Sequence, residues 1–164
     1  MYRRLFATVT VVAVVAAACQ PATTELTEDQ KAEIAGTVSA IHAEHRNAWR
    51  DADIDRGMSY FHDDPDVQFA LEGAVMHGSG TIRDALEPIF EGVASQEITI
   101  AESQTVVLAP GVVCVMDQGT FAYVDTAGVT GPETAFAFTA VYVRRGGEWK
   151  VLLAHESLPT PESM

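Results

Sequence analysis

Histidines and one aspartate are the side chains of this 164-residue sequence that are best suited to proton transfer. Asp117 is the only acid placed in the middle of an otherwise apolar run (VVCVMD), and apolar surroundings can tune a carboxylate as a general base. The same position also suits a strand bulge or an exposed strand end before Gly119. His155 is the other candidate, with a hydrogen-bonded core or pocket-mouth histidine as its alternative role. Asp117 and His155 are therefore the candidate catalytic residues.

Two further patterns predict where a pocket would form. Alternate residues of a strand share a face, so an inward Trp149 on the last predicted strand would bring His155 inward as well. His45 lies on the apolar stripe of the first predicted helix, between Ile41 and Trp49, where a polar group needs a partner or a wet cavity. The alternative for His45 is the solvent-exposed edge of that helix face. We expect one ligand pocket lined by His45, Trp49, Tyr60, Phe61, Trp149 and His155.

Several other chemistries lack their sequence patterns. His42 and His45 are three residues apart, but the sequence IHAEH has the spacing of neither HExxH nor HxxEH, and no further motif completes a metal-ligand set. Gly78-Ser79-Gly80 is not the GxSxG nucleophile elbow, and the sequence has no glycine-rich phosphate cradle. We therefore predict neither a metal nor a cofactor.

The elements that must position these residues change their hydrophobic period halfway along the chain. Three-and-four spacing after a cap at Thr27 or Asp29 predicts a long helix to about Ala52, and Asp53 is placed to cap a second, shorter helix. A small hairpin over 67–71 and 74–77, an amphipathic helix over 81–92, and strands over 98–108, 112–124, 134–144 and 149–157 follow. This order predicts an α+β domain whose helices cover one face of an antiparallel sheet.

The N-terminus predicts export. Arg3-Arg4 precedes an apolar core over 5–15, which is too short to span a bilayer permanently. Ala16-Ala17-Ala18 then leads into Cys19, a junction that resembles the lipobox of bacterial lipoproteins, with an ordinary secretory signal as the alternative. Gln20 resembles the outer-membrane sorting pattern, so we expect a lipid-anchored protein on the periplasmic side of the cell envelope. The expected organisation is a signal peptide (1–18), a lipidated tether (19–27), one domain (28–158) and a C-terminal tail (159–164).

Composition argues against some partners. The formal net charge is −13 and the acidic residues are scattered, so the surface should repel nucleic acid and anionic lipid head groups. Only two cysteines are present, Cys19 and Cys114, and lipidation of the first would leave the second without a partner. No disulfide framework is therefore predicted.

Several short segments together resemble a known family. They are Trp49 with the acidic break Asp51–Asp55, Tyr60–Asp64, His77–Ile82, and Gly146–Val151 leading to His155–Ser157. In this order they resemble the nuclear transport factor 2-like superfamily, in its SnoaL-like bacterial branch. The resemblance implies a cone: a strongly curved antiparallel sheet wrapped around three N-terminal helices, with a cavity between them. Close relatives often carry two alternate histidines before the terminal Ser, whereas Leu153 replaces the first of them here.

Two functions stay open, because this fold hosts isomerases, cyclases, dehydratases and non-catalytic adaptors alike. The favoured one is an exported lipoprotein whose cone binds a small, largely apolar or aromatic molecule, or serves as a dimeric interaction module. The alternative is a cofactor-independent isomerase-, cyclase- or dehydratase-like enzyme in which His155 or Asp117 moves a proton. Strands with apolar residues on both faces also predict a homodimer through the outer face of the sheet.

Overall fold

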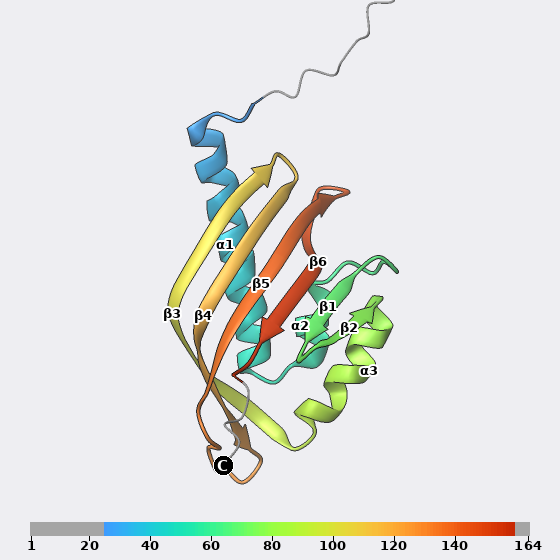
Figure 1. Ribbon diagram of the computed structural model, residues 1–164, viewed down its shortest axis with the longest axis vertical. Coiled ribbons are helices and arrows are strands. Elements are labelled where there is room, and N and C mark those ends of the chain that lie inside the picture. Colours follow the sequence, from blue (N-terminus) through green and yellow to red (C-terminus); the bar gives the residue numbers. More distant parts are fainter. Residues whose placement is uncertain (1–24, 160–164) are drawn as a thin grey trace, which may run out of the picture.

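Three helices lie against one side of a six-stranded sheet in the computed structural model, which describes residues 25–159 (Figure 1). The elements are α1 (Glu28–Arg50), α2 (Ile54–Ser59), β1 (Gln68–Leu71), β2 (Ala74–His77), α3 (Ser79–Phe90), β3 (Val93–Ala109), β4 (Val112–Asp125), β5 (Thr134–Arg145) and β6 (Glu148–Ser157). Every predicted helix and strand has a counterpart, although β3 begins at Val93 rather than at Ile98. The predicted signal peptide and Cys19 lie outside the described residues. Within 25–159, no helix is both long and apolar enough to cross a membrane.

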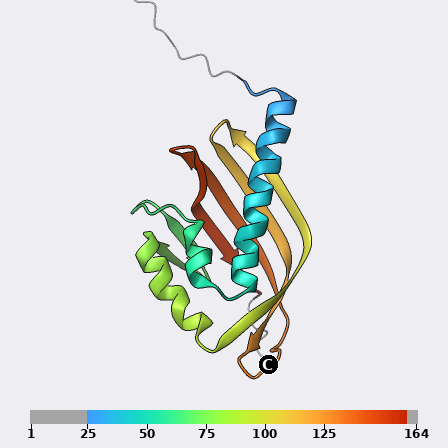
Figure 2. The same cartoon turned by 180° about the vertical axis from the view of Figure 1, so that it is seen from behind.

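Helix α1 begins where its sequence predicts. The Thr27 side chain accepts a hydrogen bond from the backbone N–H of Gln30, and the Gln30 side chain accepts one from the backbone N–H of Thr27. This capping box satisfies two donors that a helix start otherwise leaves open. From there α1 crosses the face of the sheet (Figure 2). Its buried residues are Val38, His42, His45 and Ala48. Two of these four are histidines, so polar groups have to be satisfied inside the domain.

The strand order is β2-β1-β6-β5-β4-β3. Strands β3 to β6 pair antiparallel in succession, with tight turns after β3 and β5 and a longer loop over 126–133 between β4 and β5. The β1–β2 hairpin joins this sheet through a parallel pairing of β1 with β6, in which Ala70 lies opposite His155. Its turn at Glu72-Gly73 has positive φ at both residues (48° and 83°), as a tight two-residue hairpin turn requires.

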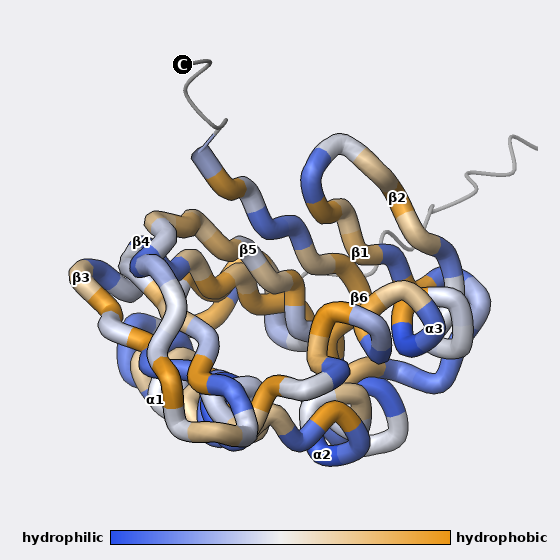
Figure 3. Tube along the Cα trace, turned by 90° about the horizontal axis from the view of Figure 1, so that it is seen from below, coloured by the Kyte–Doolittle hydropathy of each residue, from blue (hydrophilic) through white to orange (hydrophobic). Residues whose placement is uncertain are grey.

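The sheet curves around the helices, as the end-on view in Figure 3 shows. Part of the curvature arises where β3 and β4 approach each other at Gly119. A Cβ atom at this position would lie 2.0 Å from the carbonyl oxygen of Thr99, so only glycine allows the two backbones to come this close. The pairing register of β3 also shifts between Ile100 and Glu102, beside this contact. Local irregularity of this kind bends a strand and increases its twist.

A second irregularity lies in β6 and sets which of its residues face inward. Tyr142 of β5 pairs with Val151, whereas its neighbour Val141 pairs with Leu153, so Leu152 is an extra residue in β6. Such a bulge breaks the strict alternation of side chains along a strand. Val151 before the bulge is fully buried, and Ala154 after it is also buried. The inward positions of β6 are therefore odd-numbered before Leu152 and even-numbered after it.

Candidate functional site

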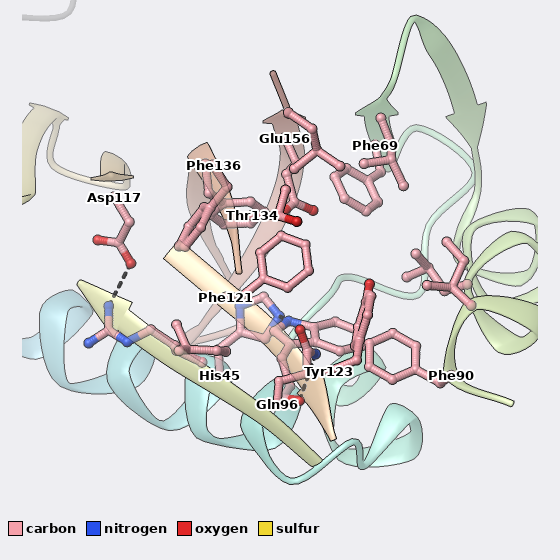
Figure 4. Close-up of a pocket in the computed structure, with 18 of the residues that line it drawn as sticks. His45, Phe69, Phe90, Gln96, Asp117, Phe121, Tyr123, Thr134, Phe136 and Glu156 are labelled. Atoms are coloured by element: carbon pink, nitrogen blue, oxygen red, sulfur yellow. Dashed lines mark hydrogen bonds and ion pairs between the residues drawn. The ribbon is translucent and has the colours of Figure 1, made fainter. Parts of the chain in front are cut away.

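A cavity of about 510 Å³ lies between the helices and the sheet (Figure 4). Its apolar lining is mainly aromatic and includes Phe61, Phe69, Phe90, Phe121, Phe136 and Phe138, besides Trp49. The lining residues at one end, His42, His45 and Asp117, are each at most 4% exposed. Glu72 and Ile89 also line the cavity and are exposed to solvent. The cavity thus has a buried inner end at α1 and β4, and a mouth beside the β1–β2 turn and α3.

The aromatic side chains form a continuous wall. The ring of Phe121 lies 5.2 Å from that of Tyr123 and 6.0 Å from that of Phe136, measured between ring centroids. Phe90 lies 6.3 Å from Tyr123 and stacks on Trp49 at 5.7 Å. These separations are those of favourable aromatic pairs. The wall joins residues from α1, α3, β4 and β5, so it holds the helices against the sheet while leaving space between them.

The inner end carries a network of buried hydrogen bonds. The hydroxyl oxygen of Tyr142 lies 2.9 Å from His42 Nδ1 and 3.1 Å from His45 Nδ1. Trp49 donates from its indole Nε1 to His45 Nε2 at 2.8 Å. His42 Nε2 lies 2.9 Å from Asp117 Oδ2. Three residues of α1 are thereby linked to β4 and β5.

The donor and the acceptor of each hydrogen bond in this network can be assigned, starting from Trp49. An indole N–H only donates, so His45 Nε2 must accept and Nδ1 carries the proton of a neutral ring. Burial and the neighbouring His42 lower the pKa of His45 to about 3, which keeps the ring neutral near pH 7. His45 Nδ1–H therefore donates to the oxygen of Tyr142, whose own proton points to His42 Nδ1. His42 Nε2–H then donates to Asp117, and the chain ends on a carboxylate.

Asp117 is an ionised carboxylate held by two donors. Besides His42, Arg46 Nη1 donates to the same oxygen, Oδ2, at 2.5 Å. Burial alone would raise the pKa of Asp117, but hydrogen bonds from His42, Ser103 and Arg46 lower it to about 2. The other oxygen, Oδ1, is buried and has no hydrogen-bond partner among the described residues. Ser103 pairs with Asp117 across β3 and β4, and its side chain contributes to holding the carboxylate ionised.

A different carboxylate lies at the mouth. Glu156 of β6 lines the cavity, as does Glu72 of the β1–β2 turn. Burial raises the pKa of Glu156 to about 7, and the charge of Glu72 adds to the rise. Burial and these two carboxylates also raise the pKa of Tyr123, which places its hydroxyl in the same negative surroundings. Neither glutamate belongs to an ion pair within residues 25–159.

The structure brings together part of the predicted pocket. His45, Trp49 and Phe61 line the cavity. Tyr60 stacks on His45 with 5.1 Å between ring centroids, but it does not line this cavity. Tyr60 and Trp149 instead line a separate, more open depression beside the first half of α1. Their predicted place in the pocket is therefore wrong, because neither residue lines the aromatic cavity.

The predicted inward position of His155 is wrong. His155 is exposed and pairs with Thr139 of β5, whose other partner across the sheet is Met116 of β4, also exposed. These three residues lie on the outer face of the sheet, away from Trp49. The reason is the bulge at Leu152, which reverses the alternation that an inward residue earlier in β6 would predict. Glu156 takes the inward position that was expected for His155.

Three functional side chains of the site were not predicted from the sequence. His42 was noted only as a neighbour of His45, although its spacing of three residues does place it on the same helix face. No local spacing identifies Tyr142, because its partners are 97 and 100 residues away in the sequence. Strict alternation from an inward Trp149 predicts that Glu156 faces outward. The run of four apolar residues 151–154 is the one sequence signal that alternation ends there.

The arrangement can hold a ligand by apolar contacts and position its polar groups by hydrogen bonds. Within the described part of the chain, no group of three His, Cys, Asp or Glu side chains is placed to hold a metal ion. At neutral pH Asp117 is a weak base, because its pKa is low, and it serves better as a hydrogen-bond acceptor. Glu156 is the carboxyl group whose pKa lies near 7.

Comparison with known proteins supports the assignment of the fold. A profile of the SnoaL-like domain matches residues 38–161. A candidate dehydratase of the nuclear transport factor 2 (NTF2)-like family from Streptomyces avermitilis superposes with a TM-score of 0.67 at 15% identity, covering 79% of this chain and 98% of that chain. A candidate scytalone dehydratase from Novosphingobium aromaticivorans gives 0.68 at 10% identity, with 82% and 89% covered.

An assembly domain has the same fold. The association domain of the C. elegans kinase CaMKII gives a TM-score of 0.63 at 14% identity, covering 79% of this chain and 98% of that chain. A search of curated proteins finds no significant match. Identities this low establish a shared fold and leave the function to be argued from the site.

Proposed function

Because the chain belongs to the SnoaL-like domain family, in a fold that relatives use for different purposes, we propose from its own site that it binds a small, largely apolar molecule in the aromatic cavity. The observation that carries this proposal is the cavity itself. Its volume of about 510 Å³ falls in the range of small-molecule sites, and such sites combine apolar walls with a few placed polar groups.

The polar network favours binding over catalysis. Both ring nitrogens of His42 and of His45 are already occupied by hydrogen bonds inside the protein. Burial raises the pKa of Tyr142 far above its ordinary value, so its hydroxyl is a poor acid. These groups therefore give the inner end a fixed shape and polarity, against which a ligand can be oriented.

The test uses a neutral hydrophobic fluorophore, N-phenyl-1-naphthylamine, whose emission rises when it leaves water. We expect saturable binding to the wild-type domain. Thr134→Trp would fill the cavity from β5 and should abolish the rise, whereas Ala135→Trp, on the exposed face of the same strand, should leave it unchanged. Equal binding by both variants, or no binding by the wild type, would refute the proposal.

A second candidate is proton transfer of the isomerase or dehydratase kind. It is favoured by one observation, the hydrogen-bonded pair of His42 and Asp117 beside Tyr142 at the end of an apolar cavity. Exchange of the α-protons of an aromatic ketone such as 2-tetralone, followed by NMR in D₂O, measures this activity. Catalysed exchange that is lost in Asp117→Asn would establish it. Exchange at the uncatalysed rate would eliminate this candidate and leave the binding proposal in place.

We also propose that the protein is exported and anchored by lipid at Cys19, on the strength of the sequence MYRRLFATVTVVAVVAAAC alone. Cys19→Ser should then move the protein from the membrane fraction to the soluble fraction. Retention of the variant in the membrane fraction at high salt would contradict this proposal.

The predicted homodimer remains a proposal as well. Met116 and Leu153 are each 41% exposed and lie on the outer face of the sheet, on β4 and β6. An apolar face of this kind is suited to packing against the same face of a second copy of the chain. The domain should sediment as a dimer at tens of micromolar, and Leu153→Lys should shift it toward the monomer; a strict monomer in the wild type would contradict the proposal.

A further inference from the structure

We propose that the cavity selects a ligand that carries a positively charged amino group: an amine with an aromatic or alicyclic body. This inference rests on the proposed binding function and specifies the class of ligand. It follows from the balance of hydrogen-bond donors and acceptors that the cavity offers, and from where the uncompensated acceptors lie.

Several donors of the lining are used inside the protein, although Arg46 and Gln96 each keep further N–H groups. Arg46 Nη1 donates to Asp117, and Gln96 Nε2 donates to the backbone carbonyl of Trp49 at 2.9 Å. The protons of His42 and His45 are committed to Asp117 and Tyr142. The hydroxyls of Tyr123 and Thr134 line the cavity, but a hydroxyl also accepts and so places no demand on the charge of a ligand.

The carboxylates at the mouth, in contrast, are left without partners within residues 25–159, whereas Asp117 at the inner end is paired through one oxygen. Asp117 has a side chain only 2% exposed, yet its Oδ1 has no hydrogen-bond partner among the described residues. Glu72 and Glu156 face the mouth and belong to no ion pair in the described part of the chain. An ionised carboxylate only accepts. At the mouth the complementary ligand therefore donates, and a cationic donor gains most from two carboxylates.

In this proposal the amino group of the ligand lies at the mouth, and its aromatic or alicyclic body lies against the aromatic wall. Glu156 and Glu72 come from adjacent strand ends, because Leu71 pairs with Glu156 in the β1–β6 register. Phe69, Phe136 and Tyr123 surround this region (Figure 4). Aromatic faces attract an ammonium group, and the net charge of −13 concentrates cations around the protein. The lining holds one permanent cation, Arg46, and Asp117 neutralises it.

Such a ligand would also couple binding to pH. The titratable groups around Glu156 are Glu72 in the β1–β2 turn and Tyr123 on β4, while Asp117, Arg46 and the two α1 histidines lie toward the inner end. Near pH 7 a fraction of Glu156 is protonated, since burial and Glu72 raise its pKa to about 7. An ammonium group favours the ionised form, so binding should release protons and affinity should rise between pH 5.5 and 8.

Three probes with one aromatic body test the charge preference directly. They are 2-(1-naphthyl)ethylamine, the corresponding alcohol 2-(1-naphthyl)ethanol, and 1-naphthaleneacetate, measured by calorimetry at pH 7.5. We expect the amine to bind at least about tenfold more tightly than the alcohol, the size of effect given by one charge-assisted hydrogen bond, and the carboxylate to bind most weakly.

Substitutions test whether the preference for the amine arises from the carboxylates at the mouth. Glu156→Gln should reduce the affinity for the amine to about that for the alcohol and remove its pH dependence, and Glu72→Gln should reduce it less. Glu97→Gln makes the same change of charge on an exposed residue of β3 and should leave the preference intact. Binding of N-phenyl-1-naphthylamine by each variant confirms that the cavity is still formed.

Two outcomes separate this inference from the proposal on which it rests. If the neutral fluorophore binds but the alcohol binds as tightly as the amine, or Glu156→Gln keeps the full preference, the amine proposal is overturned and the cavity remains a binding site. If neither the fluorophore nor any naphthyl probe binds, both proposals fall together.

Discussion

Removing the Tyr142 hydroxyl tests whether the polar network at the inner end of the cavity stabilises the domain. In Tyr142→Phe, His42 Nδ1 and His45 Nδ1 both lose their partner, while the two residues are only 4% and 1% exposed. An unsatisfied buried polar group costs about 1–3 kcal/mol, and water entering from the cavity would offset part of the cost for two. We therefore expect a loss of about 2–4 kcal/mol in the free energy of unfolding. Urea unfolding measures it as a lower midpoint with an unchanged slope.

The matched control is Tyr123→Phe. This hydroxyl lies toward the mouth, is part of a half-buried residue, and makes no hydrogen bond among the described residues, so its loss should cost under about 1 kcal/mol. Combining Tyr142→Phe with Trp49→Phe should cost less than the sum of the two, because both changes break the same chain through His45. Stability of Tyr142→Phe within about 0.5 kcal/mol of the wild type would refute the assignment of the network.

Three further predictions follow from groups already described. The pKa of His45 is lowered in the folded state, so the unfolded chain binds a proton that the folded domain does not, and stability should fall by up to about 1.4 kcal/mol per pH unit between pH 6.5 and 3; a pH series of urea unfolding should be shallower for His45→Gln. The pKa of Glu156 is raised, so its ionisation opposes folding between about pH 4.5 and 7, and Glu156→Gln should gain in melting temperature over the wild type from pH 5 to 8. A Cβ atom at Gly57 would lie 2.6 Å from the Trp49 ring, so Gly57→Ala should cost about 1–3 kcal/mol and shift tryptophan emission, whereas Gly36→Ala, with nothing within 4 Å, should stabilise α1 slightly.

The elements of this fold were predictable because their signals are local. Thr27 and Asp53 cap α1 and α2 through backbone groups three residues away, and both caps form as their residue types predict. The Glu72-Gly73 turn is fixed by its own two residues. The period of two in β4 and β5 arises from strands with one face against the helices. No long-range information is needed for any of these features.

The site was only partly predictable because its contacts join distant segments. The burial of His45 follows from the helix stripe, but its partner Tyr142 lies 97 residues away and nothing in the spacing identifies it. The ionised state of Asp117 depends on His42 and Arg46, which reach it from another element. The inward residue of β6 depends on a bulge that forms against β5. Periodicity predicts a face, but it does not predict where the period is interrupted.

The bulge at Leu152 also makes the chemistry of the cavity depend on how β6 pairs with β5. His155 and Glu156 are neighbours on opposite faces of β6, and the extra residue decides which of the two lines the cavity. If the same sequence paired with β5 without the bulge, alternation would continue unbroken from Val151. His155 would then line the mouth in place of Glu156, and an imidazole would replace a carboxylate without a substitution of either side chain. Deletion of Leu152, in contrast, would leave a regular strand in which Glu156 still faces the cavity. A one-residue slip in the pairing of this strand end is therefore enough to convert a site suited to a cation into one suited to a different ligand.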